Sequence, residues 1–235
     1  MRTLVKIVLL GSAGILAACG GAEGGPAKSS AAGANGAADS NGSTNSSASE
    51  PSFDCATAIE PAEKLICGDS QLAAMDREVA RLYQLAIKDK SSVPTADALA
   101  MAQDEWITAR NQCGADADLR SCIAWDYAER AHKLRQGSAA ARAADPAGIS
   151  DGPVAYRCKG LDMLISATYL NSDPGVVYLE WGEDSLALMQ TASGSGAKYT
   201  AKSDEGDYSF WTKGEEAMFQ RPGVLETTCA EEPIG

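Results

Sequence analysis

The stretch "GSAAARAADPAGISDG", residues 137–152, separates two parts of the chain whose apolar residues recur with different periods. Before it, apolar side chains recur every three or four residues, which is typical of helices; after it they alternate, which is typical of strands. The stretch itself is rich in Ala, Gly, Asp and Ser and contains Pro146, a linker-like composition. We therefore predict a helical domain at 53–136 and a β domain at 153–235, joined by a linker at 137–152.

The helical part carries three apolar stripes with helical spacing. Breaks at 94–95 and 114–116 separate them, and Pro61 suits the start of a further short helix, with Glu60 or Ile59 near its cap. The stripes consist of Leu72, Met75, Val79, Leu82 and Ala86; of Leu99, Ala102, Trp106 and Ala109; and of Leu119, Ile123, Tyr127, Ala131 and Leu134. They predict a small helical bundle with a thin core.

The β part consists of short, β-rich runs separated by Gly, Asn, Asp or Pro. The runs are "VAYRC", "LISATY", "VVYLEW", "LALMQ", "KYTA", "YSFWTK", "EAMFQ" and "VLETTC". About eight short strands in about 80 residues indicate an antiparallel barrel or sandwich. The fold class is therefore α + β, with two domains.

Seven cysteines are present, and setting Cys19 aside leaves six, which in an exported chain indicate three disulfides. Cys158 and Cys229 lie in the first and last predicted strands, so we expect a Cys158–Cys229 disulfide that ties the ends of the sheet together. A zinc site is not expected, because His132 is the only histidine and no closely spaced CxxC pair occurs. We expect neither a metal nor a cofactor.

The other four cysteines belong to the helical part, and their spacing alone does not fix the pairing. Cys67 is expected at the start of a long helix and Cys113 at the end of its antiparallel neighbour, which favours a Cys67–Cys113 disulfide. Cys55–Cys122 would then complete the set.

Residues 1–18 have the features of a secretory signal peptide. The basic start "MRTLVK" precedes the run "IVLLGSAGILAA", which is apolar but too short to span a membrane. "LAAC" at 16–19 resembles the bacterial lipobox, which implies cleavage before Cys19 and a lipid anchor on its sulfur. The residue after Cys19 is Gly20 and not Asp. By analogy with bacterial lipoproteins, this indicates that the protein is anchored in the outer membrane. The Gly-, Ala-, Ser- and Asn-rich segment 19–52 is expected to be a flexible tether.

The net charge of −12 restricts the class of partner. A strongly acidic chain is not suited to binding nucleic acid, whose phosphates need a basic surface, or to an anionic lipid surface as its target. It suits a basic protein partner.

The run "SGSGAKY" at 193–199 invites catalytic interpretations that the rest of the chain does not support. Ser195-Gly-Ala-Lys198 fits the S-x-x-K nucleophile motif, but no S-D-N or K-T-G element accompanies it, and alternation in a strand would place the two residues on opposite faces. A phosphate loop is not favoured, because Ala197 separates Gly196 from Lys198. A plain hairpin tip is the simplest alternative, although "FWTKG" at 210–214 places a second lysine in a similar position.

"YRC", "ATY", "SGSGAKY", "FWTKGEEA" and "TTC", in this order over 154–229, resemble the MliC family of membrane-bound inhibitors of c-type lysozyme. The resemblance implies an eight-stranded antiparallel barrel with a disulfide, on a lipoprotein that faces the periplasm. In that family the serine and the lysine of these runs enter the lysozyme cleft. Carried over by motif, they are Ser195 and Lys213, with Tyr199 supporting the first loop and Gly214 the second turn.

This sequence departs from the family pattern in two places. Gly194 stands where the family usually has Ala, which would loosen the loop, and "TAKSDEGDYS" looks longer than usual.

"FDCATAIEPAEKLICGDSQLAAMDREVARLYQ", "QDEWITARNQC" and "CIAWDYAERAHKL", over 53–135, resemble the N-terminal domain of LprI-type lysozyme-inhibitor lipoproteins. No binding residue is implied there. The two resemblances together predict a lipid-anchored inhibitor of c-type lysozyme, not an enzyme, in the outer membrane and facing the periplasm. The alternative is a non-inhibitory envelope protein that binds cell-wall glycan or another protein.

Overall fold

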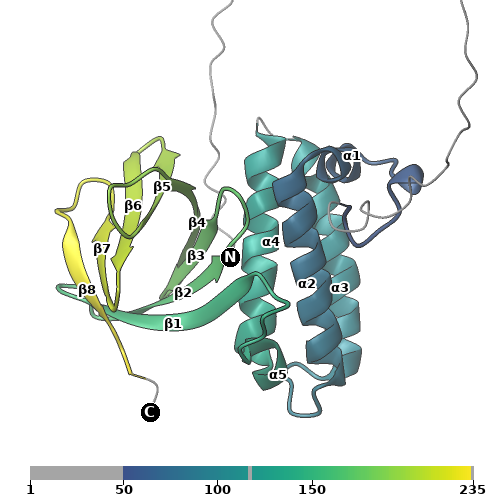
Figure 1. The fold of residues 1–235 in the computed structure, drawn as a ribbon, viewed down its shortest axis with the longest axis horizontal. Helices are drawn as coiled ribbons and strands as arrows, with labels where there is room; N and C mark the ends of the chain where they lie inside the picture. Colours follow the sequence, from purple (N-terminus) through teal and green to yellow (C-terminus); the bar gives the residue numbers. More distant parts are fainter. Residues whose placement is uncertain (1–49, 116–117, 234–235) are drawn as a thin grey trace, which may run out of the picture.

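A helical unit and a β-barrel lie side by side in the computed structural model, which describes residues 50–115 and 118–233 (Figure 1). The predicted signal peptide, Cys19 and nearly all of the predicted tether lie outside the described residues. No helix within the described ranges is long and apolar enough to cross a membrane.

The helical unit is built from three long helices and several short ones. They are the turn η2 (Cys55–Thr57), α1 (Pro61–Gly68), α2 (Ser70–Lys88), α3 (Ala96–Asn111), the turn η3 (Gln112–Ala115), α4 (Leu119–Gly137) and α5 (Ala139–Arg142). The first predicted stripe is fully buried in α2, and the third is buried in α4 except for Leu119, which is half-buried. The second stripe is only partly buried, and Ala109 is exposed, because α3 lies on the outer side of the unit (Figure 1).

Side-chain carboxylates fix where the helices begin. Asp69 accepts hydrogen bonds from the backbone N–H groups of Gln71 and Leu72 at 3.0 and 3.1 Å, and so caps α2. Asp118 caps α4 in the same way, with the backbone N–H of Ser121 at 3.2 Å. Such caps satisfy N–H groups that have no partner within the helix. Asp69 also separates the short helix α1 from α2, so Cys67 lies near the end of α1 and not, as predicted, at the start of a long helix.

The β unit is a closed barrel of eight antiparallel strands in sequence order. This confirms the predicted α + β fold class and shows that the β part is a barrel and not a sandwich. The strands are β1 (Ser150–Cys158), β2 (Leu164–Leu170), β3 (Val176–Trp181), β4 (Asp184–Thr191), β5 (Ala197–Ser203), β6 (Gly206–Lys213), β7 (Glu216–Gln220) and β8 (Thr227–Glu231). Pairing of β1 with β8 closes the barrel. Cys158 lies opposite Cys229 in that pairing, and the two form a disulfide, the pair expected from the sequence.

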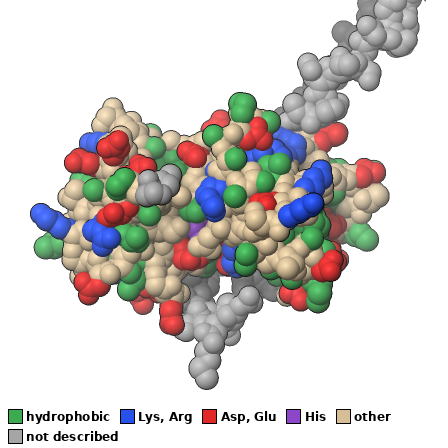
Figure 2. All heavy atoms as spheres, turned by 90° about the horizontal axis from the view of Figure 1, so that it is seen from below, with side chains coloured by type: hydrophobic (Ala, Val, Ile, Leu, Met, Phe, Trp, Pro, Cys, Tyr) green, Lys and Arg blue, Asp and Glu red, His purple; other side chains and the backbone are tan. Residues whose placement is uncertain are grey.

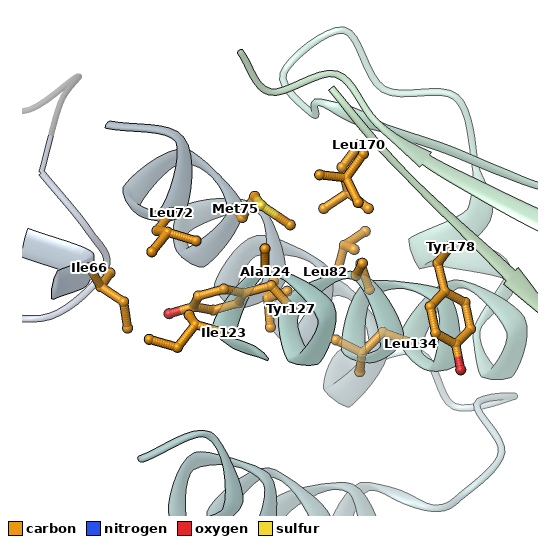
Figure 3. Close-up of a cluster of buried hydrophobic side chains, with 14 of the residues drawn as sticks. Ile66, Leu72, Met75, Leu82, Ile123, Ala124, Tyr127, Leu134, Leu170 and Tyr178 are labelled. Carbon is orange, nitrogen blue, oxygen red and sulfur yellow. The ribbon is translucent and has the colours of Figure 1, made fainter. Parts of the chain in front are cut away.

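β3 is buried on both of its faces. Val177 and Leu179 point into the barrel core, whereas Val176 and Tyr178 belong to the core of the helical unit. Figure 3 shows Tyr178 and Leu170, from β3 and β2, beside side chains of the helices. The barrel therefore supplies one wall of the helical core, which compensates for the small size of the helical unit.

The predicted linker at 137–152 is ordered, and it contains α5 and the start of β1. Arg135, from the end of α4, organises it although its side chain is almost completely buried. Its guanidinium donates to the carbonyl oxygens of Gly152, Ala141 and Arg142 at 2.6, 3.1 and 3.0 Å. Buried guanidinium groups need such partners, so this cluster fixes the path of the chain between the two units.

The disulfides of the helical unit pair differently from the favoured prediction, which was wrong. Cys55 is bonded to Cys67, and Cys113 to Cys122. The reason is local: Cys67 lies in the separate helix α1 and reaches the preceding turn η2, whereas Cys113 lies in η3 and reaches the first turn of α4. Each disulfide therefore closes a short loop instead of joining distant helices.

Candidate functional site

The barrel topology brings the predicted site residues to one end of the molecule. In an up-and-down barrel, the β2–β3, β4–β5 and β6–β7 connections all lie at the same end. Ser195 lies in the β4–β5 connection at 192–196, beyond the last paired residues Thr191 and Lys198. Lys213 ends β6 and pairs with Glu216, so that Gly214 lies in a tight two-residue turn with a φ of +62°. We call the segments 192–196 and 213–216 the two site loops.

Trp211 connects the two site loops. Its indole N–H donates a hydrogen bond to the carbonyl oxygen of Ser195 at 2.8 Å. Its ring carries the ammonium group of Lys213, whose Nζ lies 3.7 Å from the ring centroid, a cation–π contact. One side chain therefore orients the backbone of the first loop and the charge of the second.

The first loop is held in shape by its own backbone and by Ser193. The Ser193 hydroxyl donates toward the carbonyl oxygens of Ser195 and Gly196, at 3.2 and 2.9 Å. Gly196 has a φ of +65°, and a Cβ placed there would lie 2.1 Å from the carbonyl oxygen of Thr212. The loop therefore lies against β6 in a way that only glycine permits.

Ser195 itself is exposed at the tip of this loop. Within the described part of the chain its hydroxyl makes no hydrogen bond, while its carbonyl is held by Trp211. The hydroxyl can therefore donate to or accept from a partner without breaking an internal contact.

Tyr199 lies below the first loop in the barrel core and is nearly fully buried. Its ring centroid is 5.9 Å from that of Tyr169. Burial raises the pKa of the Tyr199 hydroxyl, and the neighbouring Tyr156 adds to the shift. A neutral, buried phenol in this position anchors the start of β5 and leaves the contact surface to the loop itself.

Lys198 is a second cation at the site. It lies opposite Trp211 in the β5–β6 pairing, and its Nζ is 5.5 Å from the centroid of the Trp211 ring. Two ammonium groups, those of Lys198 and Lys213, thus flank one indole. Sequence reasoning did not include Trp211 among the site residues, although the W-x-K spacing places Trp211 and Lys213 on the same strand face.

Two other features of the helical unit, a cavity and a group of potential metal ligands, have partners within the protein. A cavity of about 220 Å³ in the helical unit is lined by Asp76 and Arg110, among others. These two groups are joined through the hydroxyl of Tyr127, at 2.8 Å from Asp76 and 3.0 Å from Arg110. Among the described residues, one group has three potential metal ligands, Asp126 with Cys113 and Cys122, but both sulfur atoms belong to a disulfide.

Comparison with known proteins finds a matching family for the barrel and relatives that align with a larger part of the chain. The family described as "MliC: Membrane-bound lysozyme-inhibitor of c-type lysozyme" matches residues 156–226, which include both site loops. Lipoprotein LprI of Mycobacterium tuberculosis and that of Mycobacterium bovis are each 32% identical over 149 residues, which are 63% of this chain and 70% of the relative. The chain belongs to the LprI lipoprotein family. No solved structure matches this LprI-family protein significantly.

Proposed function

We propose that this LprI-family protein inhibits c-type lysozyme by placing Ser195 and Lys213 in the active-site cleft of the enzyme. The observation that carries the proposal is the Trp211 bridge, within the stretch that matches the MliC family. It presents a hydroxyl and an ammonium group together at one barrel end. The protein itself performs no catalysis in this proposal.

The chemistry of the target explains why these two groups would inhibit it. Lysozyme uses one protonated carboxylic acid and one carboxylate on either side of the scissile bond. An ammonium group between them favours the ionised form of both, and so opposes the protonated general acid. A serine hydroxyl can hydrogen-bond either carboxyl group at close range.

The site loops are arranged so that binding would cost little ordering. Trp211 and Ser193 hold the first loop, and the two-residue turn at Gly214 holds the second. Groups that are already positioned lose less conformational entropy when they bind. In this proposal, Tyr199 and Gly214 support the two site loops and contribute less to binding than Ser195 and Lys213, which enter the cleft.

The net negative charge of the protein favours association with a basic enzyme. The net charge is −12, and acidic and basic side chains are interspersed over both units on the face drawn in Figure 2. Long-range attraction would speed the encounter with a basic lysozyme, while Lys198 and Lys213 face the acidic cleft. In the same proposal, a lipid on Cys19 anchors the protein in the outer membrane, facing the periplasm, where it protects peptidoglycan.

The test is a titration of a c-type lysozyme with the soluble chain from Gly20 onward, followed as hydrolysis of cell-wall substrate. We expect inhibition, weakened by about 1–3 kcal/mol in Ser195→Ala and in Lys213→Ala, if both groups are buried in the complex. Lys202→Ala is the matched control, because Lys202 lies at the far end of the same β5–β6 pair, opposite Asp207. The absence of inhibition up to high micromolar concentration would contradict the proposal and leave the envelope-binding alternative.

A further inference from the structure

The cavity of about 220 Å³ in the helical unit is lined by α1, α2, α3 and the segment that precedes them. Both α1 and α3 lie on the side of the unit away from the barrel (Figure 1). Asp76 and Arg110 are almost completely buried and form its floor, whereas Ser52 and Thr57, at its edge, are exposed. Pockets for drug-sized ligands measure about 300–1,000 Å³, so this cavity is suited to one smaller molecule.

The floor of the cavity holds a guanidinium group in a fixed orientation. Arg110 is 4% exposed, and its Cζ lies 5.6, 5.5 and 5.8 Å from the ring centroids of Phe53, Trp106 and Tyr127. Its Nε and Nη2 donate to Oδ1 of Asn111 at 3.1 and 2.9 Å, and Nη1 donates to the hydroxyl of Tyr127 at 3.0 Å. Within the described residues, the second N–H of Nη2 makes no hydrogen bond. One buried and oriented donor therefore remains for a ligand.

Asp76 supplies an acceptor beside this donor. Its Oδ1 accepts from the hydroxyl of Tyr127 at 2.8 Å and lies 3.5 Å from Nη1 of Arg110. Its Oδ2 accepts from the backbone N–H of Ser52 at 2.5 Å. A carboxylate has about four lone-pair sites, so Asp76 keeps acceptor capacity. The charges of Asp76 and Arg110 cancel, and the floor offers a donor and an acceptor with no net charge.

Stability alone does not explain why this ion pair is buried. Removing two charges from water costs about as much free energy as their attraction returns, and apolar side chains of similar volume often stabilise a protein more. A few polar groups that converge on a largely apolar cavity are the common arrangement of a ligand site. The Asp76–Arg110 pair, on the wall of a cavity, is therefore better explained by ligand binding.

The group that matches this floor is a secondary amide. Its carbonyl oxygen accepts from a guanidinium N–H, and its own N–H donates to a carboxylate. A carboxylate ligand would be repelled by Asp76, and an ammonium ligand by Arg110, whereas an amide is neutral. Val79 and Ala80 line the same cavity and suit the methyl group of an acetamido substituent.

The edge of the cavity is complementary to the hydroxyl groups of a sugar ring. Oε1 of Gln103 accepts from Nε and Nη2 of Arg130 at 3.0 and 2.8 Å, and within the described ranges its Nε2 makes no hydrogen bond. Glu63 is held by Nδ2 of Asn111 at 3.1 Å and by the backbone N–H of Ile59 at 3.0 Å. A positioned amide donor and a positioned carboxylate acceptor suit hydroxyl groups, which both donate and accept.

We propose that the cavity of the helical unit binds an N-acetylated sugar unit. Its acetamido group lies on Asp76 and Arg110, and its hydroxyl groups face Gln103 and Glu63. The residues that line the cavity all precede the barrel in the chain, so this site does not depend on the proposed inhibition of lysozyme. The helical unit thereby has a ligand of its own, an N-acetylated glycan.

The test is an NMR titration of the soluble chain from Gly20 onward with N-acetylglucosamine. We expect the signal of the Trp106 indole N–H, which donates to the carbonyl oxygen of Asp126 at 3.2 Å, to move with a dissociation constant on the order of 1 mM. The indole signals of Trp181 and Trp211, both in the barrel, should not move. Glucose lacks the acetamido group and glucosamine carries an ammonium group instead, so both should bind at least about 10-fold more weakly.

Two variants locate the ligand within the cavity. Ala80→Leu fills the cavity without removing a polar group, and Arg110→Lys keeps the charge but loses the planar donor fork, so each should weaken binding at least about 10-fold. Ala109→Leu is the matched control, because Ala109 is exposed on α3 and lies outside the lining of the cavity. Inhibition of lysozyme should be the same in Ala80→Leu and in the parent chain.

The titration of the parent chain does not depend on the folding of any variant. A saturable shift at Trp106 that is lost in Ala80→Leu and kept in Ala109→Leu would support the proposal. No saturable shift up to high millimolar N-acetylglucosamine would overturn it, and so would equal affinity of the two alanine variants. Tighter binding of glucosamine than of N-acetylglucosamine would show a site for amines and would also overturn it.

Discussion

The indole N–H of Trp211 donates a hydrogen bond to the carbonyl oxygen of Ser195 over 2.8 Å, while the same ring lies under the ammonium group of Lys213. Two loops from different strand pairs thus share one support. Trp211→Phe keeps a ring for the lysine but removes the N–H donor, so we expect inhibition of a c-type lysozyme to weaken by about 1 kcal/mol. Trp211→Ala removes the cation–π contact as well and should weaken it further.

Tyr208→Phe is the control for this change, because it removes a polar group from another aromatic residue of β6, toward the far end of the strand. Its inhibition constant should equal that of the parent chain. Trp211→Phe with parental potency would mean that the hydrogen bond does not position Ser195 for binding.

The two glycines of the first loop should respond differently to the same substitution. Gly196→Ala places a methyl group 2.1 Å from the carbonyl oxygen of Thr212 at a φ of +65°, so the loop must move away from β6. We expect a lower melting temperature and an inhibition constant raised about 10-fold or more. Gly194→Ala meets nothing within 4 Å and should change neither quantity.

Gly194 is also the position where the MliC resemblance expects Ala, and the exposed tip of the loop accommodates either residue. Thermal unfolding and lysozyme titration of both variants make the comparison. Equal behaviour of the two would show that the loop conformation at Gly196 is not required.

The sequence predicted the barrel well because its strands carry local signals. Turn residues separate each run, and Cys158 and Cys229 mark the strands that close the sheet. The site loops were predicted only from their resemblance to the MliC motifs. Side chains alternate between the two faces of β6, so Trp211 and Lys213, two residues apart, lie on the same face of the strand.

The contact between the units was not predicted, although β3 contains a signal for it. Its run "VVYLEW" is apolar at nearly every position, which is typical of a strand covered on both faces. Spacing alone does not say that the second cover is α4. The predicted cysteine pairing was wrong for a related reason: the long helix begins only after the cap at Asp69, so Cys67 lies in the short helix α1, within reach of η2.

Loop length should rank the contributions of the three disulfides to stability. Cys158 and Cys229 are separated by 71 residues, whereas the helical disulfides close intervals of 12 and 9 residues. In the chain-entropy description, loss of the barrel disulfide lowers the free energy of unfolding by about 4 kcal/mol and loss of either helical disulfide by about 3 kcal/mol.

Urea unfolding of double Cys→Ala variants, one disulfide at a time, checks this order. Peptide mapping of the non-reduced parent chain checks the pairing itself. A larger loss from the Cys55–Cys67 pair than from the Cys158–Cys229 pair would contradict the ranking.

His132 should make stability depend on pH at the border between the two units. It is fully buried, with Nδ1 2.8 Å from the Thr168 hydroxyl and Nε2 3.7 Å from the carboxylate of Glu180. Burial lowers the pKa of His132 to about 4 and Lys133 adds to this, whereas Glu129 opposes the shift. Glu180 also favours the protonated form, but the cost of burying an imidazolium outweighs it.

The sign follows from the protons bound in each state. Between pH 6.5 and 4 the unfolded chain protonates this histidine and the folded protein does not, so stability is full above pH 6.5 and is lost as the pH falls toward 4. The loss from this group is on the order of 3 kcal/mol. His132→Gln can keep a hydrogen bond to Thr168 and does not titrate, so its stability should depend less on pH over this range. Because the chain has a single histidine, its NMR titration gives the folded-state pKa directly, and a value near 6.5 would contradict the prediction.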